Sequence, residues 1–243
     1  MRNLKICGLQ KTTLLDYPGH VAATVFIGGC NFRCPFCHNG ELVTNINPVM
    51  TKSELLSFLK KRSGILKGVC ITGGEPTLYP EELKELMMDI KNLGFLIKLD
   101  TNGTNPEFLS QCIGEKLVHY VAMDVKAPFS EYGNACGISL GGQNEAITEQ
   151  VMESVRRLKW FMLFGMVDGE FRTTLVKGIH HLDTMSELIP VLDGAKKYYL
   201  QQYVASNLVL EPSGLSAFTK EEMEACADLF RPYIAEVSVR GVL

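Results

Sequence analysis

Short runs of β-branched and aromatic residues alternate with helical patterns through most of the chain, and this alternation limits the possible folds more than any other feature. Candidate strands lie at 21–29, 67–74, 95–100, 116–124, 170–176, 196–204 and 236–240. Helical patterns lie between them at 51–62, from Pro80 to Gly94, and near 106–113, 145–160 and 184–193, and a last helix begins at Thr219. Strands separated by helices are typical of βαβ units and a parallel sheet.

The number of these units favours an incomplete barrel. Six or so βα units fall short of the eight of a closed barrel. We therefore predict an α/β fold that is a partial, open (β/α)6 TIM-like barrel, as one domain over 1–243, with a doubly wound sheet as the alternative. Both architectures place chemistry at the carboxyl ends of strands, where 73–76, 100–103, 124–126 and the cysteines at 30–37 stand.

Composition excludes several classes of protein. The chain has 243 residues, 46% hydrophobic and 21% charged, which is an ordinary globular composition. A net charge of -3 provides no electrostatic footprint for nucleic acid. We see no secretory signal and no window near the roughly 18 apolar residues of a membrane span. We therefore expect a cytoplasmic protein without nucleic-acid or membrane partners, whose eight cysteines stay reduced.

Five cysteines are scattered among apolar neighbours, and three are clustered. A free cysteine is commonly a small buried hydrophobe, which is our interpretation of Cys7, Cys70, Cys112, Cys136 and Cys226. The cluster lies in GGCNFRCPFCHNG at 28–40.

A structural zinc site is one interpretation of this cluster. Such sites combine one Cys-x-x-Cys pair with a second Cys or His pair at a distance. Cys34 and Cys37 form one pair, but Cys30 comes from the same loop and no second pair follows. His38 would have to fold back sharply to share a metal with its neighbour Cys37.

An iron–sulfur cluster is the other interpretation. Ferredoxin loops use Cys-x-x-Cys-x-x-Cys with a fourth cysteine from elsewhere. The wider first gap here departs from that pattern. Three thiolates from one loop suit three irons of a cubane cluster and leave the fourth iron open to a substrate or cofactor.

Cys30, Cys34 and Cys37, with Phe36 before the last cysteine, match the signature of the radical S-adenosylmethionine (SAM) enzymes. TGGEP at 72–76 resembles the family's Gly-Gly-Glu segment, which meets the methionine amino group. The resemblance implies one [4Fe-4S] cluster on the three cysteines and SAM on the open iron. It implies cofactor contacts at Gly73, Gly74 and Glu75, where glycine lets the backbone approach a ligand closely.

The head of the chain resembles the activases of glycyl radical enzymes, and within them those of anaerobic ribonucleoside-triphosphate reductase. LDYPGHVAATVFIGGCNFRCPFCHN carries Asp16, Pro18 and Gly19 of that pattern, and DTNG (100–103) and MDVK (123–126) follow. The resemblance implies that side chains of these last two segments lie near the SAM carboxylate and a bound monovalent cation. These residues are Asp100, Thr101, Asn102, Asp124 and Lys126.

Two further details follow from the same resemblance. FRTTLVKGIH (171–180) is similar to a strand whose arginine pairs with the cofactor, which nominates Arg172, although Lys177 stands where relatives often have proline. Between Cys37 and Gly73 the chain has only Cys70, so we expect one cluster rather than several.

The implied activity is reductive cleavage of SAM to a 5′-deoxyadenosyl radical, with an electron from flavodoxin or ferredoxin. In an activase the radical removes a hydrogen atom from a glycine of a partner enzyme, here expected to be the anaerobic reductase. No acid–base set is needed, so we assign His20, His119, His180 and His181 structural roles. A radical enzyme acting on a small molecule or nucleobase precursor, and a non-enzymatic iron–sulfur or zinc protein, remain as alternatives.

Overall fold

The computed structural model describes residues 4–138 and 142–242, and its centre is one eight-stranded sheet. The strands follow one another in chain order from β1 to β8. Only the first pair, β1 with β2, is antiparallel, and the remaining pairs are parallel. The strands are β1 (Ile6–Thr13), β2 (Ala22–Ile27), β3 (Gly68–Gly73), β4 (Leu96–Thr101), β5 (Tyr120–Asp124), β6 (Asp168–Leu175), β7 (Lys197–Gln202) and β8 (Glu236–Arg240).

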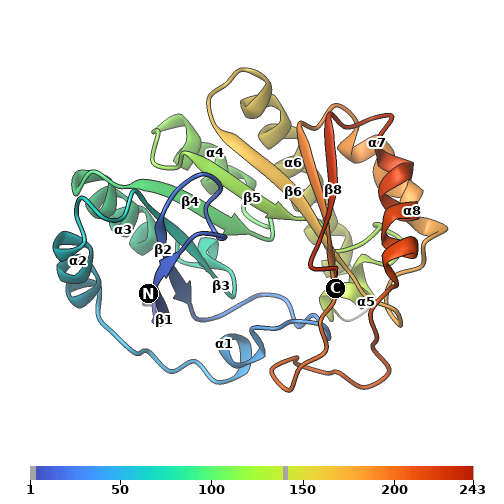
Figure 1. The fold of residues 1–243 in the computed structure, drawn as a ribbon, viewed down its shortest axis with the longest axis horizontal. Coiled ribbons are helices and arrows are strands. Elements are labelled where there is room, and N and C mark those ends of the chain that lie inside the picture. Colours follow the sequence, from blue (N-terminus) through green and yellow to red (C-terminus); the bar gives the residue numbers. More distant parts are fainter. Residues whose placement is uncertain (1–3, 139–141, 243) are drawn as a thin grey trace.

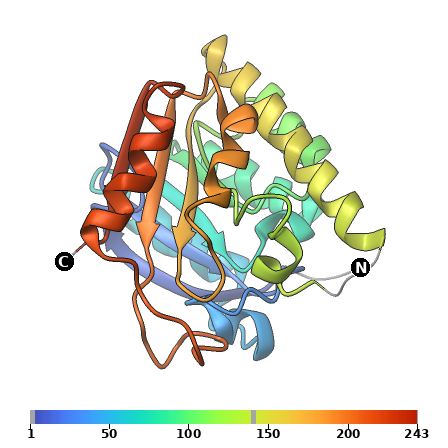
Figure 2. The same cartoon turned by 90° about the vertical axis from the view of Figure 1, so that its right-hand side faces the viewer.

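Helices follow most of the parallel strands and cover the outer face of the curved sheet (Figures 1 and 2). The α-helices are α1 (Gly40–Thr44), α2 (Lys52–Lys61), α3 (Pro80–Asn92), α4 (Pro106–Gly114), α5 (Tyr132–Cys136), α6 (Gly142–Leu163), α7 (Ile189–Leu192) and α8 (Lys220–Phe230). Two short 3-10 helices are η1 (Pro76–Leu78) and η2 (Thr184–Leu188). None of the helices in the described ranges is long and apolar enough to cross a membrane.

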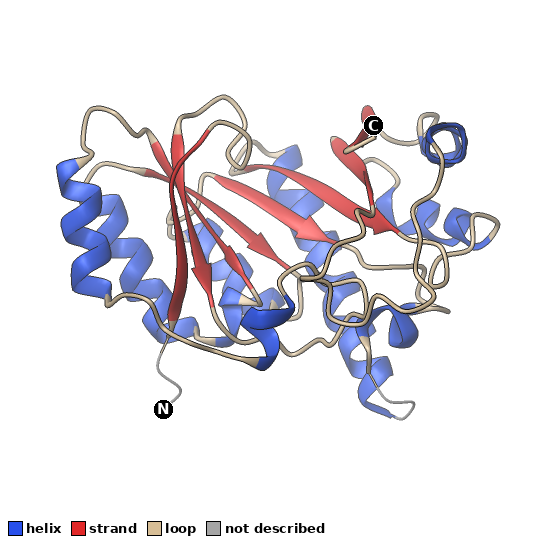
Figure 3. Ribbon diagram, turned by 60° about the horizontal axis from the view of Figure 1, so that its bottom comes forward, coloured by secondary structure: helices blue, strands red, loops and turns tan. Residues whose placement is uncertain are grey.

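The strand order confirms the open, partial barrel. A doubly wound sheet reverses its strand order at a switch point. Here the order runs from one edge to the other without reversal, and β1 and β8 are its two edges. Figure 3 shows the strands fanning out as one twisted sheet.

The parallel register brings the carboxyl ends of neighbouring strands together. Ile27 at the end of β2 pairs with Gly73, and Thr101 of β4 pairs with Met123. Asp124 at the end of β5 pairs with Arg172. The loops that leave these strands therefore meet at one edge of the sheet.

Local capping signals and buried faces explain most elements. Capping boxes start α2 and α8, with Thr51 accepting from the amide of Glu54 and Thr219 from that of Glu222. Gly94 has a φ of 86° just after α3, as a helix C-cap requires. Of the five scattered cysteines, four are buried and Cys7 is partly buried.

Three of the elements that differ from the sequence prediction have a clear local cause. The strand β1 was missed because ICGLQKTT buries only its two end residues, as an edge strand does. The strand expected from residue 116 begins at Tyr120, because Lys116 and Leu117 still donate to carbonyls of α4. The helix expected near 184–193 is divided into η2 and α7, with Pro190 near the start of α7.

Candidate functional site

The three clustered cysteines occupy the loop that connects β2 to α1. Cys34 is buried, whereas Cys30 and Cys37 are partly exposed. The loop folds on itself, since the Cys37 amide donates to the Cys34 carbonyl at 3.0 Å and the Phe32 amide lies 3.3 Å from the Cys30 sulfur. These thiols face a cavity at the carboxyl ends of the strands.

A segment far along the chain fixes the outer side of this loop. The amide of Leu210 donates to the Cys37 carbonyl at 3.1 Å, and that of Glu211 to the Pro35 carbonyl at 2.9 Å. His38 Nε2 lies 2.6 Å from the carbonyl oxygen of Val204. His38 is therefore held by the backbone of this later segment.

Burial keeps two of the three thiols protonated in the metal-free chain. It raises the pKa of Cys30 to about 12 and also raises the pKa of Cys37, against the opposing effect of Lys126. A hydrogen bond from Cys136 lowers the pKa of Cys34. Because iron binds thiolates, loading of a cluster must release protons from this loop.

The arrangement of the thiols is not that of a single-ion site. Within 4–138 and 142–242, no three His, Cys, Asp or Glu side chains converge closely enough to hold one metal ion. Three thiols spaced around a cavity suit a cluster, whose irons each take one sulfur ligand. The chemistry of the donor set therefore fits three irons of a [4Fe-4S] cluster.

The Gly-Gly-Glu segment lies directly against the cysteine loop. The amide of Glu75 donates to the Gly29 carbonyl at 2.7 Å. A Cβ added to Gly74 would lie 2.0 Å from that same oxygen, and Gly73 has a φ of 130°. Only glycine permits this approach of two backbones, which is the physical reason for both residues.

Glu75 itself is fully buried behind the cavity wall. Its Oε1 accepts from the Thr77 amide at 3.0 Å and the Thr101 hydroxyl at 2.8 Å, and its Oε2 accepts from the Asn102 amide at 2.6 Å. Burial raises the pKa of Glu75, and these hydrogen bonds oppose the rise. Glu75 therefore positions the segment after β4 instead of facing the cavity.

Charged residues from three strands line the opposite wall. Arg172 Nε donates to Asp124 Oδ1 at 2.8 Å, and its NH1 lies 3.3 Å from Asp100 Oδ2. Lys126 Nζ lies 2.8 Å from the other oxygen of Asp124. Burial alone would raise the pKa of Asp124, but Arg172 and Lys126 lower it, so its carboxylate stays ionised.

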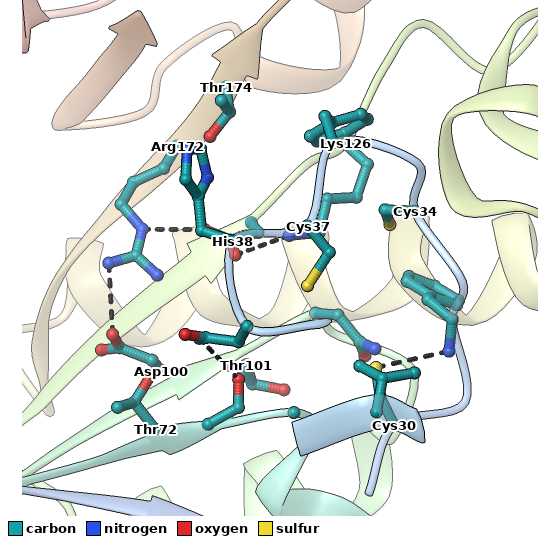
Figure 4. Close-up of a pocket in the computed structure, with 18 of the residues that line it drawn as sticks. Cys30, Cys34, Cys37, His38, Thr72, Asp100, Thr101, Lys126, Arg172 and Thr174 are labelled. Atoms are coloured by element: carbon teal, nitrogen blue, oxygen red, sulfur yellow. Dashed lines mark hydrogen bonds and ion pairs between the residues drawn. The ribbon is translucent and has the colours of Figure 1, made fainter. Parts of the chain in front are cut away.

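Figure 4 shows how the two groups face one cavity, with the cysteines on one side and Asp100 and Arg172 on the other. The cavity has a volume of about 230 Å³. Of the predicted site residues, all except Glu75 line it: Cys30, Cys34, Cys37, Gly73, Gly74, Asp100, Thr101, Asn102, Asp124, Lys126 and Arg172.

The sequence prediction missed several other lining residues. Thr72, Thr174 and Gln201 line the wall at the ends of β3, β6 and β7, and His38 lines it from the cysteine loop. Thr174 was recognisable, because alternate residues of a strand face the same side and Arg172 lies two positions before it. His38 was considered only as a metal ligand, so its place in the cavity wall was not predicted.

Curated relatives of the chain include enzymes of two kinds. The chain is 29% identical over 241 residues to a Methanocaldococcus jannaschii protein assigned as a glycyl-radical enzyme activating enzyme, covering 98% of this chain and 96% of the relative. It is 34% identical to a 7-carboxy-7-deazaguanine synthase of Neisseria meningitidis, covering 49% and 50% of the two chains. It is also 34% identical to the pyruvate formate-lyase-activating enzyme of Clostridium pasteurianum, covering 41% and 43%.

Solved structures share the fold at low identity. Streptococcus suis SuiB bound to S-adenosylmethionine aligns with a TM-score of 0.58 at 13% identity, covering 90% of this chain and 46% of that chain.

The model of the Radical SAM superfamily matches residues 24–172, a range from β2 to Arg172 that includes the cysteine loop. The chain therefore belongs to the radical SAM superfamily, whose enzymes use a [4Fe-4S] cluster and S-adenosylmethionine.

Proposed function

We propose that this enzyme generates a glycyl radical on a partner protein. Cys30, Cys34 and Cys37 would hold the cluster through which one electron from an external donor would cleave the SAM sulfonium to methionine and a 5′-deoxyadenosyl radical. That radical would take a hydrogen atom from a glycine Cα of the partner, giving 5′-deoxyadenosine and the glycyl radical. The supporting relatives are the two activating enzymes, of which one matches along nearly the whole chain.

The observation that carries the proposal is the single cavity with thiols on one wall and paired charges on the other. We assign Cys30, Cys34 and Cys37 to the cluster. Backbone groups of Gly73 and Gly74 would meet the methionine amino group beside the cysteine loop.

The charged wall and its support complete the assignment. Asp100, Thr101, Asn102, Asp124, Lys126 and Arg172 would contact the polar groups of SAM. The guanidinium of Arg172 suits a carboxylate, since its donors can bind two oxygens at once. Glu75 acts through Thr101 and Asn102, which it holds in place.

The residues that line the cavity favour a substrate that reacts from outside. This cavity, at about 230 Å³, is lined by the cluster residues and the proposed SAM residues together. Three other pockets within the described ranges are lined by residues remote from the cysteine loop. A loop of a partner protein can present one glycine to such a site without a further pocket.

A second candidate is a radical reaction on a small heterocycle. It is supported by the 7-carboxy-7-deazaguanine synthase relatives, which match about half of the chain or less. In that case a purine-like compound, and not a protein, would lose the hydrogen atom.

The proposal also covers the partner enzyme, the electron donor, the cellular compartment and the domain organisation. We propose the anaerobic ribonucleoside-triphosphate reductase as the glycine donor, on the resemblance of the head of the chain, and flavodoxin or ferredoxin as the electron donor. Eight free cysteines and an open iron suit a reducing cytoplasm. One sheet and one main core support a single working domain over 1–243.

Anaerobic reconstitution tests the proposal. Iron, sulfide, dithionite and SAM should yield 5′-deoxyadenosine, and addition of the reductase should produce a glycyl radical signal in electron paramagnetic resonance. Cys30→Ala, Cys34→Ala and Cys37→Ala should lose the cluster, whereas Cys226→Ala, a buried thiol of α8, should retain it. Product from a deazaguanine precursor without a glycyl radical would favour the second candidate, and a chain that holds zinc and forms no 5′-deoxyadenosine would refute both.

A further inference from the structure

A lysine lies inside the barrel beneath the charged wall. Lys98 precedes Asp100 by two positions in β4, so both side chains point to the same face of the sheet. Lys98 is 2% exposed, and its ammonium contacts the Asp100 carboxylate. It also lies 3.8 Å from the Cys70 sulfur and 5.9 Å from the centre of the Tyr120 ring.

Lys98 belongs to an alternating series of charges that reaches the cavity. Both oxygens of Asp100 have cationic partners, Lys98 on Oδ1 and Arg172 on Oδ2. Both oxygens of Asp124 also have cationic partners, with Arg172 on Oδ1 and Lys126 on Oδ2. Three fixed cations therefore face two carboxylates.

This series leaves little place for a bound monovalent cation. The resemblance to the activases implied such an ion near Asp100, Thr101 and Asp124. An ion bound to either carboxylate would lie beside a fixed ammonium or guanidinium in a largely buried environment, where repulsion between like charges is poorly screened. The donor set therefore does not fit a sodium or potassium ion while these ion pairs are intact.

Burying the Lys98 ammonium costs free energy, and its position in the sheet does not require a charged side chain. An ammonium loses its hydration in the protein interior, and an apolar side chain would fill the same inward position without that loss. Its attraction to Asp100 offsets this cost. Removal of the lysine would leave Asp100, at the cavity wall, with Arg172 as its remaining cationic partner.

We infer that Lys98 supplies, as part of the chain, the positive charge that a monovalent cation would otherwise supply at Asp100, so that SAM binding is independent of sodium and potassium. The inference rests on the proposed SAM contacts of this wall.

The first test uses the wild-type chain. SAM affinity of the reconstituted protein is measured by calorimetry in about 0.1 M sodium, potassium or choline chloride, at equal ionic strength. We expect the same dissociation constant, within about twofold, in all three salts. Binding that weakens about tenfold or more in choline would overturn the inference.

The second test uses Lys98→Met, which removes the charge and keeps a long flexible side chain. We expect SAM binding about tenfold weaker in choline, with recovery in sodium or potassium chloride as an ion pairs with the freed Oδ1 of Asp100. Lys84→Met is the matched control, because Lys84 pairs with Glu115 at the surface and should show no salt dependence. Tight binding of SAM to Lys98→Met in choline would refute the role of Lys98.

A third measurement decides the case if Lys98→Met does not fold. An ion that binds the native state raises the thermal midpoint of the metal-free wild-type protein. Equal midpoints in the three salts support the inference, and a higher midpoint in sodium or potassium chloride contradicts it. If SAM binds in none of the salts, the proposed SAM site fails, while the midpoints still report on Lys98.

Discussion

His180 Nε2 lies 2.7 Å from the carbonyl oxygen of Lys126. Its other ring nitrogen accepts from the Val176 amide at 3.2 Å, so Nε2 carries the proton and donates it to Lys126. The ring also packs edge-on against Phe36 of the cysteine loop, with centroids 5.6 Å apart. One buried histidine therefore joins the segment after β6, the segment after β5 and the cysteine loop.

His180→Phe should weaken both the fold and the SAM site. The variant keeps a ring against Phe36 but leaves the Lys126 carbonyl without its donor, which should cost about 1–3 kcal/mol in the free energy of unfolding. Lys126 would also be less well positioned, so SAM affinity should fall. Denaturant unfolding and calorimetry measure the two effects. His181→Phe, at an exposed neighbour, is the control and should change neither.

The burial of His180 also predicts a pH dependence of stability. Burial lowers the pKa of His180 in the folded chain, although its hydrogen bond to the Lys126 carbonyl opposes this. The unfolded chain therefore takes up the proton first, and the free energy of unfolding should decrease as the pH falls below about 6.5. His119, whose pKa is also lowered by burial, contributes in the same direction. His180→Phe should flatten the curve in part, and an unchanged slope would contradict the assignment.

The strand ends and the cysteine loop could be predicted from the sequence, because each clear β-branched run ends in a glycine, cysteine or charged motif. The side-chain and backbone contacts across the barrel could not be predicted. Glu75 was expected at the ligand, but the Thr101 hydroxyl and the Asn102 amide turn its carboxylate into the wall. Lys98 lies within FLIKLD, where a lysine in the middle of a strand is normally expected to face solvent. Its burial and its pairing with Asp100 were therefore not predicted. Long-range pairing of Leu210 with Cys37 leaves no local signal in either segment.

The contact of Gly74 with the cysteine loop gives a sharp prediction. Gly74→Ala places a methyl group 2.0 Å from the Gly29 carbonyl oxygen, and backbone atoms on both sides must move. We expect reconstituted protein with less bound iron and weaker SAM binding, measured by iron analysis and calorimetry. Gly114→Ala is the matched control, since a Cβ there meets no atom within 4 Å and Gly114 ends α4. Full cluster loading in Gly74→Ala would show that the two loops do not need this close approach.

The amino-terminal end of β6, away from the cysteines, holds a partly buried ion pair that carries the last prediction. Glu170 of β6 is 1% exposed and accepts from the Tyr120 hydroxyl at 2.6 Å. Two guanidinium nitrogens of Arg240 lie 2.9 and 3.2 Å from its two oxygens. Arg240, in β8, also stacks on the Tyr199 ring at 3.3 Å. This pair ties the edge strand to the middle of the sheet.

Arg240→Met should lower the free energy of unfolding by about 1–3 kcal/mol, because the buried Glu170 carboxylate loses a partly exposed cationic partner but keeps the Tyr120 hydroxyl as a donor. Adding Glu170→Gln should recover part of the loss, since the amide is neutral and still accepts from Tyr120. Denaturant unfolding of the two single variants and the double variant measures this coupling. Arg231→Met is the control, because Arg231 pairs at the surface with Glu224 and should cost less than about 1 kcal/mol. Additive losses in the double variant would show that Arg240 contributes packing on Tyr199 and not charge.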